Sequence, residues 1–255
     1  MCTLVLLRRP GHRWPVLIAA NRDEMVDRPW DPPAAHWPDR PDVVAGRDRL
    51  AGGSWLGYNA SGVVAAILNR TDSLGPAAGK RSRGELVLDA LDYEDAGDAA
   101  AALAAIDPAA YRTFNLVIAD NRDAYWLRSR DGRSPVEAVV MPAGLSMLTS
   151  ANLNDTQNFR IAAYLPCFTE ATPPDPDAGD WSSWRSILGS RQTRPEAGPS
   201  GAMSIVTDYG YGTVSSSLIA LAAPDAKFRQ GVRDIWLFAK GRPDEADFAP
   251  VDLPA

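Results

Sequence analysis

The sequence contains few of the residues that bind metals, ligate haem or form disulfides. Only Cys2 and Cys167 are cysteines, and only His12 and His36 are histidines, in a chain of 255 residues. Two cysteines without metal-like spacing predict neither a disulfide framework nor a zinc site. Both histidines stand in turn-like sequence, so we expect them at the surface and not in a catalytic or metal site. We therefore predict no metal and no cofactor, and few side chains here can serve as a general base.

Long apolar runs and an excess of positive charge are absent as well. No segment approaches the roughly 18 continuous apolar residues of a membrane-spanning helix. The apolar run at residues 2–7 is short and has no charged region before it, unlike a signal peptide. Because the net charge is -6 and phosphate binding needs clustered lysine and arginine, nucleic acid is not an expected partner. The sequence thus predicts a cytoplasmic protein with no transmembrane segment.

Among the residues that are present, Cys2 is the most informative because it directly follows Met1. Methionine aminopeptidase accepts only small second residues, so a cysteine here permits the removal of Met1. The thiol and a free α-amine would then belong to the same residue. Such an amine has a pKa of about 7.7 to 8.0, so near neutral pH it can accept the thiol proton. Cys2 is therefore a candidate nucleophile with its own base, and the simpler alternative is a small apolar residue that begins a strand.

Apolar patterns predict strands, helices, strands, helices and strands in chain order. Strands are expected at residues 2–7, 14–20, 62–68, 114–119, 124–128, 136–140, 145–150, 213–222 and 228–238. Helices are expected at residues 82–91, 96–106, 158–164 and 181–188. The first two strands flank Pro10 and Gly11 and predict a hairpin, and the last two strands predict another. Segregated runs of this kind are typical of α+β folds, in which sheets pack on each other with helices outside.

Three stretches carry more specific expectations. Ser82 and Glu85 have the spacing of a capping box at the start of the first helix. The proline-rich residues 28–42 are expected to form an ordered loop without regular structure. We predict one domain over residues 1–240 and a mobile acidic tail over residues 241–255.

Several motifs occur in the order in which one family has them. They are Met1-Cys2-Thr3, Asn21-Arg22-Asp23-Glu24, Gly53-Ser54-Trp55-Leu56-Gly57, Ala66-Ile67-Leu68-Asn69-Arg70, Ser82-Arg83-Gly84, Ser150-Ala151-Asn152-Leu153 and Tyr211-Gly212-Thr213-Val214-Ser215-Ser216. Together they resemble the Asn-Arg-Asp-Glu (NRDE) family, which includes transport and Golgi organisation protein 2, and they extend over nearly the whole chain. Asn121-Arg122-Asp123 repeats part of one motif in an expected hairpin turn. The first copy is the informative one because it follows the first hairpin and occurs together with Cys2.

The resemblance implies an N-terminal nucleophile hydrolase-like fold, an αββα sandwich of two stacked antiparallel sheets flanked by helices. In related cysteine enzymes such as choloylglycine hydrolases and penicillin acylases, the N-terminal cysteine attacks an amide carbonyl. An arginine and an aspartate near the end of the second strand lie beside it, and asparagines contribute to the oxyanion site. Cys2 and Asp23 match this pattern, whereas Arg22 lies a couple of positions away from the arginine of those hydrolases.

The resemblance and the residue chemistry together predict a site. The predicted catalytic residues are Cys2, Arg22, Asp23, Asn69 and Asn152, and the predicted substrate contacts are Asn21, Trp55 and Tyr58. Asp23 would hold the α-amine, and Arg22 would lower the thiol pKa or bind a substrate carboxylate. The two later asparagines end apolar strands, where their N–H groups can point at a developing oxyanion. The simpler alternatives are a surface ion pair for Arg22 and Asp23, turn capping for the asparagines and core packing for the aromatic residues.

These predictions leave functions of different classes open. The favoured function is a hydrolase or acyltransferase that acts on a non-peptide carbon–nitrogen bond, with a small-molecule amide as substrate. The alternative is a non-catalytic carrier or chaperone for haem or a lipid, because relatives in the family have been linked to haem trafficking and lipid metabolism. Against haem, neither His12 nor His36 lies in an apolar segment that would make it an axial ligand. A third alternative is a scaffold whose thiol is inert.

Overall fold

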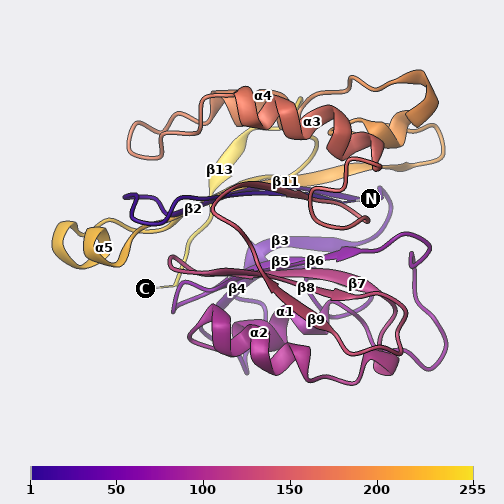
Figure 1. Ribbon diagram of the computed structural model, residues 1–255, viewed down its shortest axis with the longest axis horizontal. Helices are drawn as coiled ribbons and strands as arrows, with labels where there is room; N and C mark the ends of the chain where they lie inside the picture. The colour runs from indigo at the N-terminus through magenta and orange to yellow at the C-terminus, as the bar shows by residue number, and fades with distance from the viewer. Residues whose placement is uncertain (1, 255) are drawn as a thin grey trace. The chain divides into compact units, whose positions relative to one another are not determined.

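The computed structural model describes residues 2–254, which contain two compact units, each built on one antiparallel sheet. Unit 1 comprises the chain up to Arg28 together with Pro142–Val251, and unit 2 comprises Pro29–Met141 with the last residues of the chain. In unit 1 the helices α3 (Phe159–Glu170) and α4 (Ser182–Leu188) lie over one face of the sheet, and in unit 2 the helices α1 (Glu85–Leu91) and α2 (Ala96–Ala104) do so (Figure 1). No helix in residues 2–254 has the length and apolar character needed to cross a membrane.

The sheet of unit 1 has six strands in the order β10-β1-β2-β11-β12-β13. Their bounds are β1 (Thr3–Arg8), β2 (Val16–Met25), β10 (Gly144–Leu148), β11 (Tyr211–Leu221), β12 (Ile235–Ala239) and β13 (Phe248–Pro250). The helices of this unit are α3 (Phe159–Glu170), α4 (Ser182–Leu188) and α5 (Pro224–Gln230), with short 3-10 turns at η2 (Pro195–Ala197) and η3 (Pro199–Gly201). Apolar side chains of α3 and α4 form one buried cluster with those of the central strands, and Phe168 packs edge-on against Trp184 at 5.5 Å.

The hairpin predicted at the start of the chain is confirmed and extends further than expected. β1 and β2 pair in antiparallel register from Thr3 opposite Asn21 to Arg8 opposite Val16. The second strand continues to Met25, so the residues of the first NRDE motif lie inside the sheet and not in a turn after it. Pairing with β11 fixes them there, with Thr213 opposite Asp23.

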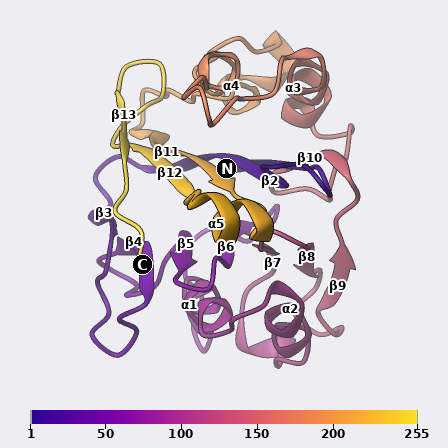
Figure 2. The ribbon, with the colours of Figure 1, turned by 90° about the vertical axis from the view of Figure 1, so that its left-hand side faces the viewer.

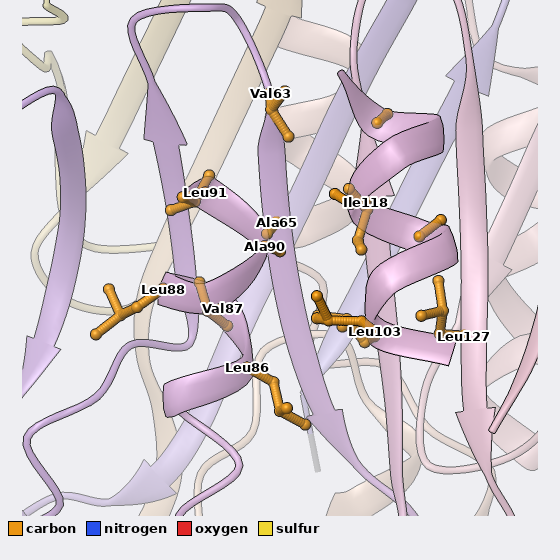
Figure 3. Close-up of a cluster of buried hydrophobic side chains, with 14 of the residues drawn as sticks. Val63, Ala65, Leu86, Val87, Leu88, Ala90, Leu91, Leu103, Ile118 and Leu127 are labelled. Atoms are coloured by element: carbon orange, nitrogen blue, oxygen red, sulfur yellow. The ribbon is translucent and has the colours of Figure 1, made fainter. Parts of the chain in front are cut away.

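The sheet of unit 2 has seven strands in the order β3-β4-β5-β6-β7-β8-β9. Their bounds are β3 (Trp30–Ala34), β4 (Val43–Asp48), β5 (Leu56–Asn59), β6 (Val64–Asn69), β7 (Phe114–Ala119), β8 (Ala124–Ser129) and β9 (Glu137–Val140). The helices α1 (Glu85–Leu91) and α2 (Ala96–Ala104) lie on one face of this sheet, and η1 (Pro108–Ala110) follows them (Figure 2). Leu86 and Leu103 of the two helices face Ala65, Ile118 and Leu127 of the sheet in a buried apolar cluster (Figure 3). This packing is the reason the short helices are stable.

The glycines of the later family motifs serve close packing in unit 2. A side chain on Gly53 would place its Cβ 2.4 Å from the backbone carbon of Gly84, and the two segments also share a bond from Ser54 N–H to the Gly84 carbonyl oxygen at 3.0 Å. A Cβ on Gly57 would lie 2.6 Å from a methyl carbon of Leu91. The motifs around these glycines therefore let the loop before β5 and helix α1 approach each other.

Residues 28–42 differ from the prediction because they contain strand β3. Pro32 and Pro33 lie in it, and the strand tolerates them because β3 is the edge strand of its sheet and its register is irregular between Asp31 and Ala34. The predicted capping box is also wrong. The Glu85 carboxylate binds Arg81 at 2.8 Å, and the residue at the helix start is Gly84, whose N–H donates to Ser82 Oγ.

The remaining differences lie in the last third of the chain. The strands β9 and β10, predicted next to each other in sequence, belong to different sheets, since β9 pairs with β8 and β10 with β1. The segment 228–238 is helical at its start, so α5 interrupts the predicted final hairpin of β11 and β12. Beyond residue 241, where we predicted a mobile tail, β13 pairs with β12. The sequence analysis did not predict this short edge strand, because the segment is rich in proline and acidic residues.

We predict that Gly53→Ala destabilises the protein by about 1 to 3 kcal/mol, because the new methyl group overlaps the Gly84 backbone, which cannot move aside as a flexible side chain would. Urea unfolding followed by circular dichroism measures this change. Gly97→Ala in α2 is the matched control, because its nearest neighbour is the side-chain carboxylate of Asp95 at 3.0 Å and alanine favours a helix. Equal unfolding midpoints for the two variants would contradict the packing role of Gly53.

Candidate functional site

One edge of the unit 1 sheet, the edge that runs across the strand ends and not along a strand, contains the ends of four strands. β1 begins at Thr3 and β11 at Tyr211, while β2 ends at Met25 and β10 at Leu148. Neighbouring strands among them are antiparallel, so the start of one strand lies beside the end of the next. The segments just outside these strands therefore meet at this edge, and Cys2 belongs to one of them.

The Cys2 thiol lies against the second strand of the hairpin. Its Sγ donates to the backbone carbonyl oxygen of Asp23 over 3.7 Å, and the Tyr211 hydroxyl donates to the same oxygen at 3.3 Å. Burial of the thiol, followed by the negative charge of Asp23, raises the pKa of Cys2 above its ordinary value, and the charge of Arg22 acts in the opposite direction. In this arrangement the thiol is protonated at neutral pH, so it needs a base before it can attack.

Tyr211 is a hydrogen-bond donor in this site and not an acid that ionises. Burial, then the charges of Cys2 and Asp23, raise its pKa well above the usual range. Its hydroxyl consequently keeps its proton and shares the Asp23 carbonyl with the thiol. This bond holds the carbonyl in a fixed position beside the sulfur.

The Asp23 carboxylate forms a buried ion pair that the sequence analysis missed. Arg160 Nη1 donates to Asp23 Oδ2 at 3.1 Å, and the exposed fractions of the two side chains are 3% and 0%. The same Nη1 donates to Thr3 Oγ1 at 2.6 Å. Arg160 lies in the first turn of α3, which Asn158 caps by accepting from the N–H groups of Arg160 and Ile161. One signal was present in the sequence, because Arg160 shares the buried face of this helix with apolar residues.

The other carboxylate oxygen of Asp23 is held by β11. Thr213 Oγ1 donates to Asp23 Oδ1 at 2.6 Å and itself accepts from the Ile205 N–H at 2.8 Å. The register of β2 and β11 shifts between Thr213 and Ser215, which makes Val214 an extra residue in β11. This bulge follows Thr213 directly, at the point where its side chain meets the carboxylate.

Arg22 and Asp23 do not form the surface ion pair that was the simpler alternative. Their exposed fractions are only 6% and 5%, and Asp23 pairs with Arg160 instead. Arg22 lies opposite Ser215 in the sheet, and its charge acts on the Cys2 thiol. Its predicted influence on the thiol is compatible with this position.

Asn21, a predicted substrate contact, forms its hydrogen bonds with groups inside the protein. Its Nδ2 donates to the carbonyl oxygens of Leu188 at 3.0 Å and Met203 at 2.9 Å, and its Oδ1 accepts from Ser216 Oγ at 2.6 Å. Both amide hydrogens are thus used inside the protein, and the residue is only 1% exposed. Asn21 links β2 and β11 to the segments that follow α4 and precede β11, which leaves it no donor for a ligand.

The second copy of the motif has a different role, as predicted. At residues 121–123 it forms the turn between β7 and β8, where Asp120 Oδ1 accepts from the N–H groups of Arg122 and Asp123. Arg122 also pairs with Asp95 at 2.9 Å. The same three residue types therefore build a surface turn in unit 2 and a buried strand in unit 1.

Asn152 follows β10 in unit 1. Because Leu148 lies opposite Leu4, the chain leaves β10 at the edge where Cys2 lies. Asn154 holds this turn on β10, since its Oδ1 accepts from the Met147 N–H at 2.7 Å and its own N–H donates back to the Met147 carbonyl. The topology thus brings Asn152 to the same edge as Cys2.

The other three predicted residues belong to unit 2. Asn69 ends β6 opposite Phe114, Tyr58 is buried in β5, and Trp55 precedes β5 with its ring edge-on to Trp30 at 5.6 Å. Gly46 leaves room for the Trp55 ring, because a Cβ there would lie 2.3 Å from it. The burial of Tyr58 agrees with core packing, Trp55 is partly buried against Trp30, and the oxyanion role of Asn69 stays a prediction.

Both histidine rings form hydrogen bonds with backbone groups a few residues away in the chain. His12 Nδ1 accepts from the Trp14 N–H at 2.9 Å, and His36 Nε2 bonds the Pro32 carbonyl at 2.7 Å. Trp14 itself is buried in the core of unit 1, and its ring N–H donates to Asp177. These positions give neither histidine the apolar surroundings of a haem ligand.

Comparisons with known proteins agree with this architecture. A family profile described as Transport and Golgi organisation 2 matches residues 1–175. The Transport and Golgi organization protein 2 homolog of Bos taurus is 35% identical over 117 residues, which are 41% of this chain and 38% of that protein. The aligned part thus spans less than half of either chain.

Solved structures of amidases are also similar. The Caenorhabditis elegans ortholog of N-acylethanolamine-hydrolyzing acid amidase has a TM-score of 0.56 at 13% identity, covering 90% of this chain and 97% of its own. The C2A mutant of conjugated bile acid hydrolase from Clostridium perfringens has a TM-score of 0.52 at 12% identity, covering 100% and 97%. Penicillin V acylase from Agrobacterium tumefaciens has a TM-score of 0.50 at 15% identity, covering 94% and 83%. At these identities the similarity concerns the fold, and it confirms the predicted N-terminal nucleophile hydrolase-like class.

We predict that Asp23→Asn lowers the pKa of the Cys2 thiol, because the substitution removes a nearby negative charge that raises it. The rate of iodoacetamide labelling of Cys2, measured against pH by peptide mass spectrometry, should then rise at lower pH than in the wild type. Labelling of Cys167 in the same samples corrects for differences in reagent concentration between samples, since this residue is exposed.

The matched control for that experiment is Glu24→Gln, which makes the same chemical change at the next residue. Glu24 lies beside Arg28 at 3.7 Å, whereas the negative charge that raises the pKa of Cys2 is that of Asp23. Its labelling profile should equal that of the wild type. An unchanged profile in Asp23→Asn would show that the carboxylate does not act on the thiol.

Proposed function

Since this chain belongs to the Transport and Golgi organisation 2 family, we propose that it is an N-terminal-cysteine hydrolase or acyltransferase acting on a non-peptide carbon–nitrogen bond. The family resemblance seen in the motifs is thereby confirmed, and the amidase-like fold supports the reaction class. One observation carries the proposal further than the fold does. The Cys2 thiol lies against β2, next to a carboxylate that a buried arginine fixes in place.

The proposed reaction begins with the removal of Met1, which lies outside the described residues. The α-amine of Cys2 takes the thiol proton, and Sγ attacks the acyl carbon of the amide. The carbon–nitrogen bond then breaks, the amine product leaves with the proton from the α-ammonium group, and a thioester remains on Cys2. Water or an acceptor nucleophile releases the acyl group and returns the proton to the thiol. A protonated resting thiol makes the amine base necessary, which agrees with the raised pKa of Cys2.

The other residues would stabilise and orient this chemistry. Asp23 would accept a hydrogen bond from the α-amine through the lone pairs that Arg160 and Thr213 leave on its carboxylate. Asn152 would donate an N–H group to the oxyanion, a bond worth about 3 kcal/mol in barrier height where it is present. Asn69 is proposed as a second donor to the oxyanion, as predicted from the sequence. Arg22 would favour the thiolate or bind an acidic substrate. We also retain the prediction that the protein works in the cytoplasm.

We predict that Cys2→Ala abolishes amide hydrolysis, lowering turnover by about 10³-fold or more, because the nucleophile is lost. A panel of fluorogenic N-acyl arylamides with different acyl groups provides the assay. Folding should persist, since the substitution removes one small atom at the start of β1, and thermal unfolding checks this. Cys167→Ala removes an exposed thiol that bonds only its own helix and should keep full activity. Undiminished turnover in Cys2→Ala would reject the nucleophile.

We further predict that the protein isolated from cells lacks Met1 and gains one acyl mass on Cys2 when it is quenched during turnover. Intact-protein mass spectrometry with peptide mapping measures both changes. Retention of Met1 on an inactive protein would reject the amine base. The haem or lipid carrier would then be the hypothesis to test, by titration of the protein with haem and with fatty-acyl ligands.

A further inference from the structure

Arg160 connects four segments of unit 1 through one guanidinium group. Nη1 donates to Thr3 Oγ1 on β1 and to Asp23 Oδ2 on β2, and Nε and Nη2 donate to the Ser200 carbonyl oxygen at 3.2 and 2.8 Å. The arginine itself is part of α3. Each of its three nitrogens donates to an acceptor, and the group lies almost entirely out of water, with 3% of the side chain exposed. Such a complete set of bonds fixes the guanidinium in one orientation.

Stability is a weak explanation for this pair. Two charges moved out of water lose much of their hydration, and replacing such a pair by apolar residues often leaves stability unchanged or raises it. The acceptors suggest a more specific role. Thr3 is the neighbour of Cys2 in the chain, and Asp23 provides the carbonyl to which the thiol donates. The arginine therefore holds one residue on each side of the candidate nucleophile.

We propose that Arg160 is a positioning residue for Cys2, which fixes Asp23 and Thr3 on the two strands beside the thiol and balances the charge of Asp23. This inference rests on the proposed function, because it assigns Arg160 to the same nucleophile. The ion-pair partner of Asp23 is thus not Arg22, as in the simpler alternative, but an arginine that lies 137 positions after Asp23 in the chain.

The charges around the thiol determine what the loss of Arg160 does. The ionisable groups at this edge are Arg22, Asp23 and Glu24 on β2, Tyr211 on β11 and Arg160 on α3. The negative charge of Asp23 raises the pKa of Cys2, and Arg160 is the cation that contacts this carboxylate. Removing the cation leaves the full field of the carboxylate on the thiol, so the pKa of Cys2 rises further.

The test compares pH profiles of Cys2 labelling by iodoacetamide in the full-length protein. Arg160→Met should shift the profile upward by about one pH unit. Arg160→Lys keeps the charge but has a single nitrogen, so its profile should stay near the wild type, while kcat on the amide panel falls and KM changes little. In Arg160→Met with Asp23→Asn both charges are gone, and the upward shift should disappear.

Tyr164→Phe is the matched control. Tyr164 lies on the same helix, and its hydroxyl bonds Ser190 and Gln192 in the segment after α4 and not Asp23. This variant should keep the wild-type profile and wild-type kcat. It separates an effect on the thiol from a general loosening of α3.

A wild-type profile in folded Arg160→Met would overturn the proposal, and so would an equal upward shift in Tyr164→Phe. If Arg160→Met does not fold, Arg160→Lys and the double variant still decide, because a positioning role requires reduced kcat in the first and no upward shift in the second. The labelling profile needs no substrate. A protein that hydrolyses no amide would therefore reject the proposed function, whereas the labelling profiles test Arg160 separately.

Discussion

Asp23 and Arg160 form an ion pair that water does not reach, and the candidate site is organised around it. The pair connects β2 to α3, and its hydrogen bonds extend to β1, to β11 and to the η3 turn. A buried carboxylate without a cationic partner would cost several kcal/mol, so the helix has to supply the arginine. The carbonyl of the same Asp23 receives the Cys2 thiol. Asp23 thus belongs both to the hydrogen-bonded framework of unit 1 and to the candidate site.

The sheet edge explains why so many polar groups can be buried together. Neighbouring antiparallel strands begin and end there, so side chains from β1, β2 and β11 converge without a long loop. Asn21 and Ser216 hold the two long strands side by side, while the bulge at Val214 follows the threonine that binds Asp23. The hydrogen bonds that hold Asp23 and Asn21 are therefore formed without a ligand, as a preorganised site requires.

The family motifs have two kinds of physical basis. Gly53 and Gly84 are required because two backbones approach too closely for a Cβ, and this contact shapes the core of unit 2. Asp23 is required because it binds Arg160, Thr213 and the thiol region in unit 1. Motif membership alone does not separate these roles, since Asn21 lies beside Asp23 in the same motif and is fully used as a structural link.

The sequence by itself determined the fold class, the first hairpin and the central strands of unit 2, and it identified Cys2 and Asp23 as candidate site residues. These features depend on local apolar patterns and on short motifs, which a single chain displays directly. Only the tertiary structure decided the partner of Asp23, because Arg160 is far away in sequence and reaches the strand through the packing of α3 on the sheet. It also decided that β3 and β13 are edge strands, where pairing with one neighbour outweighs their proline content. Long-range contacts set these features, and local sequence carries little information about them.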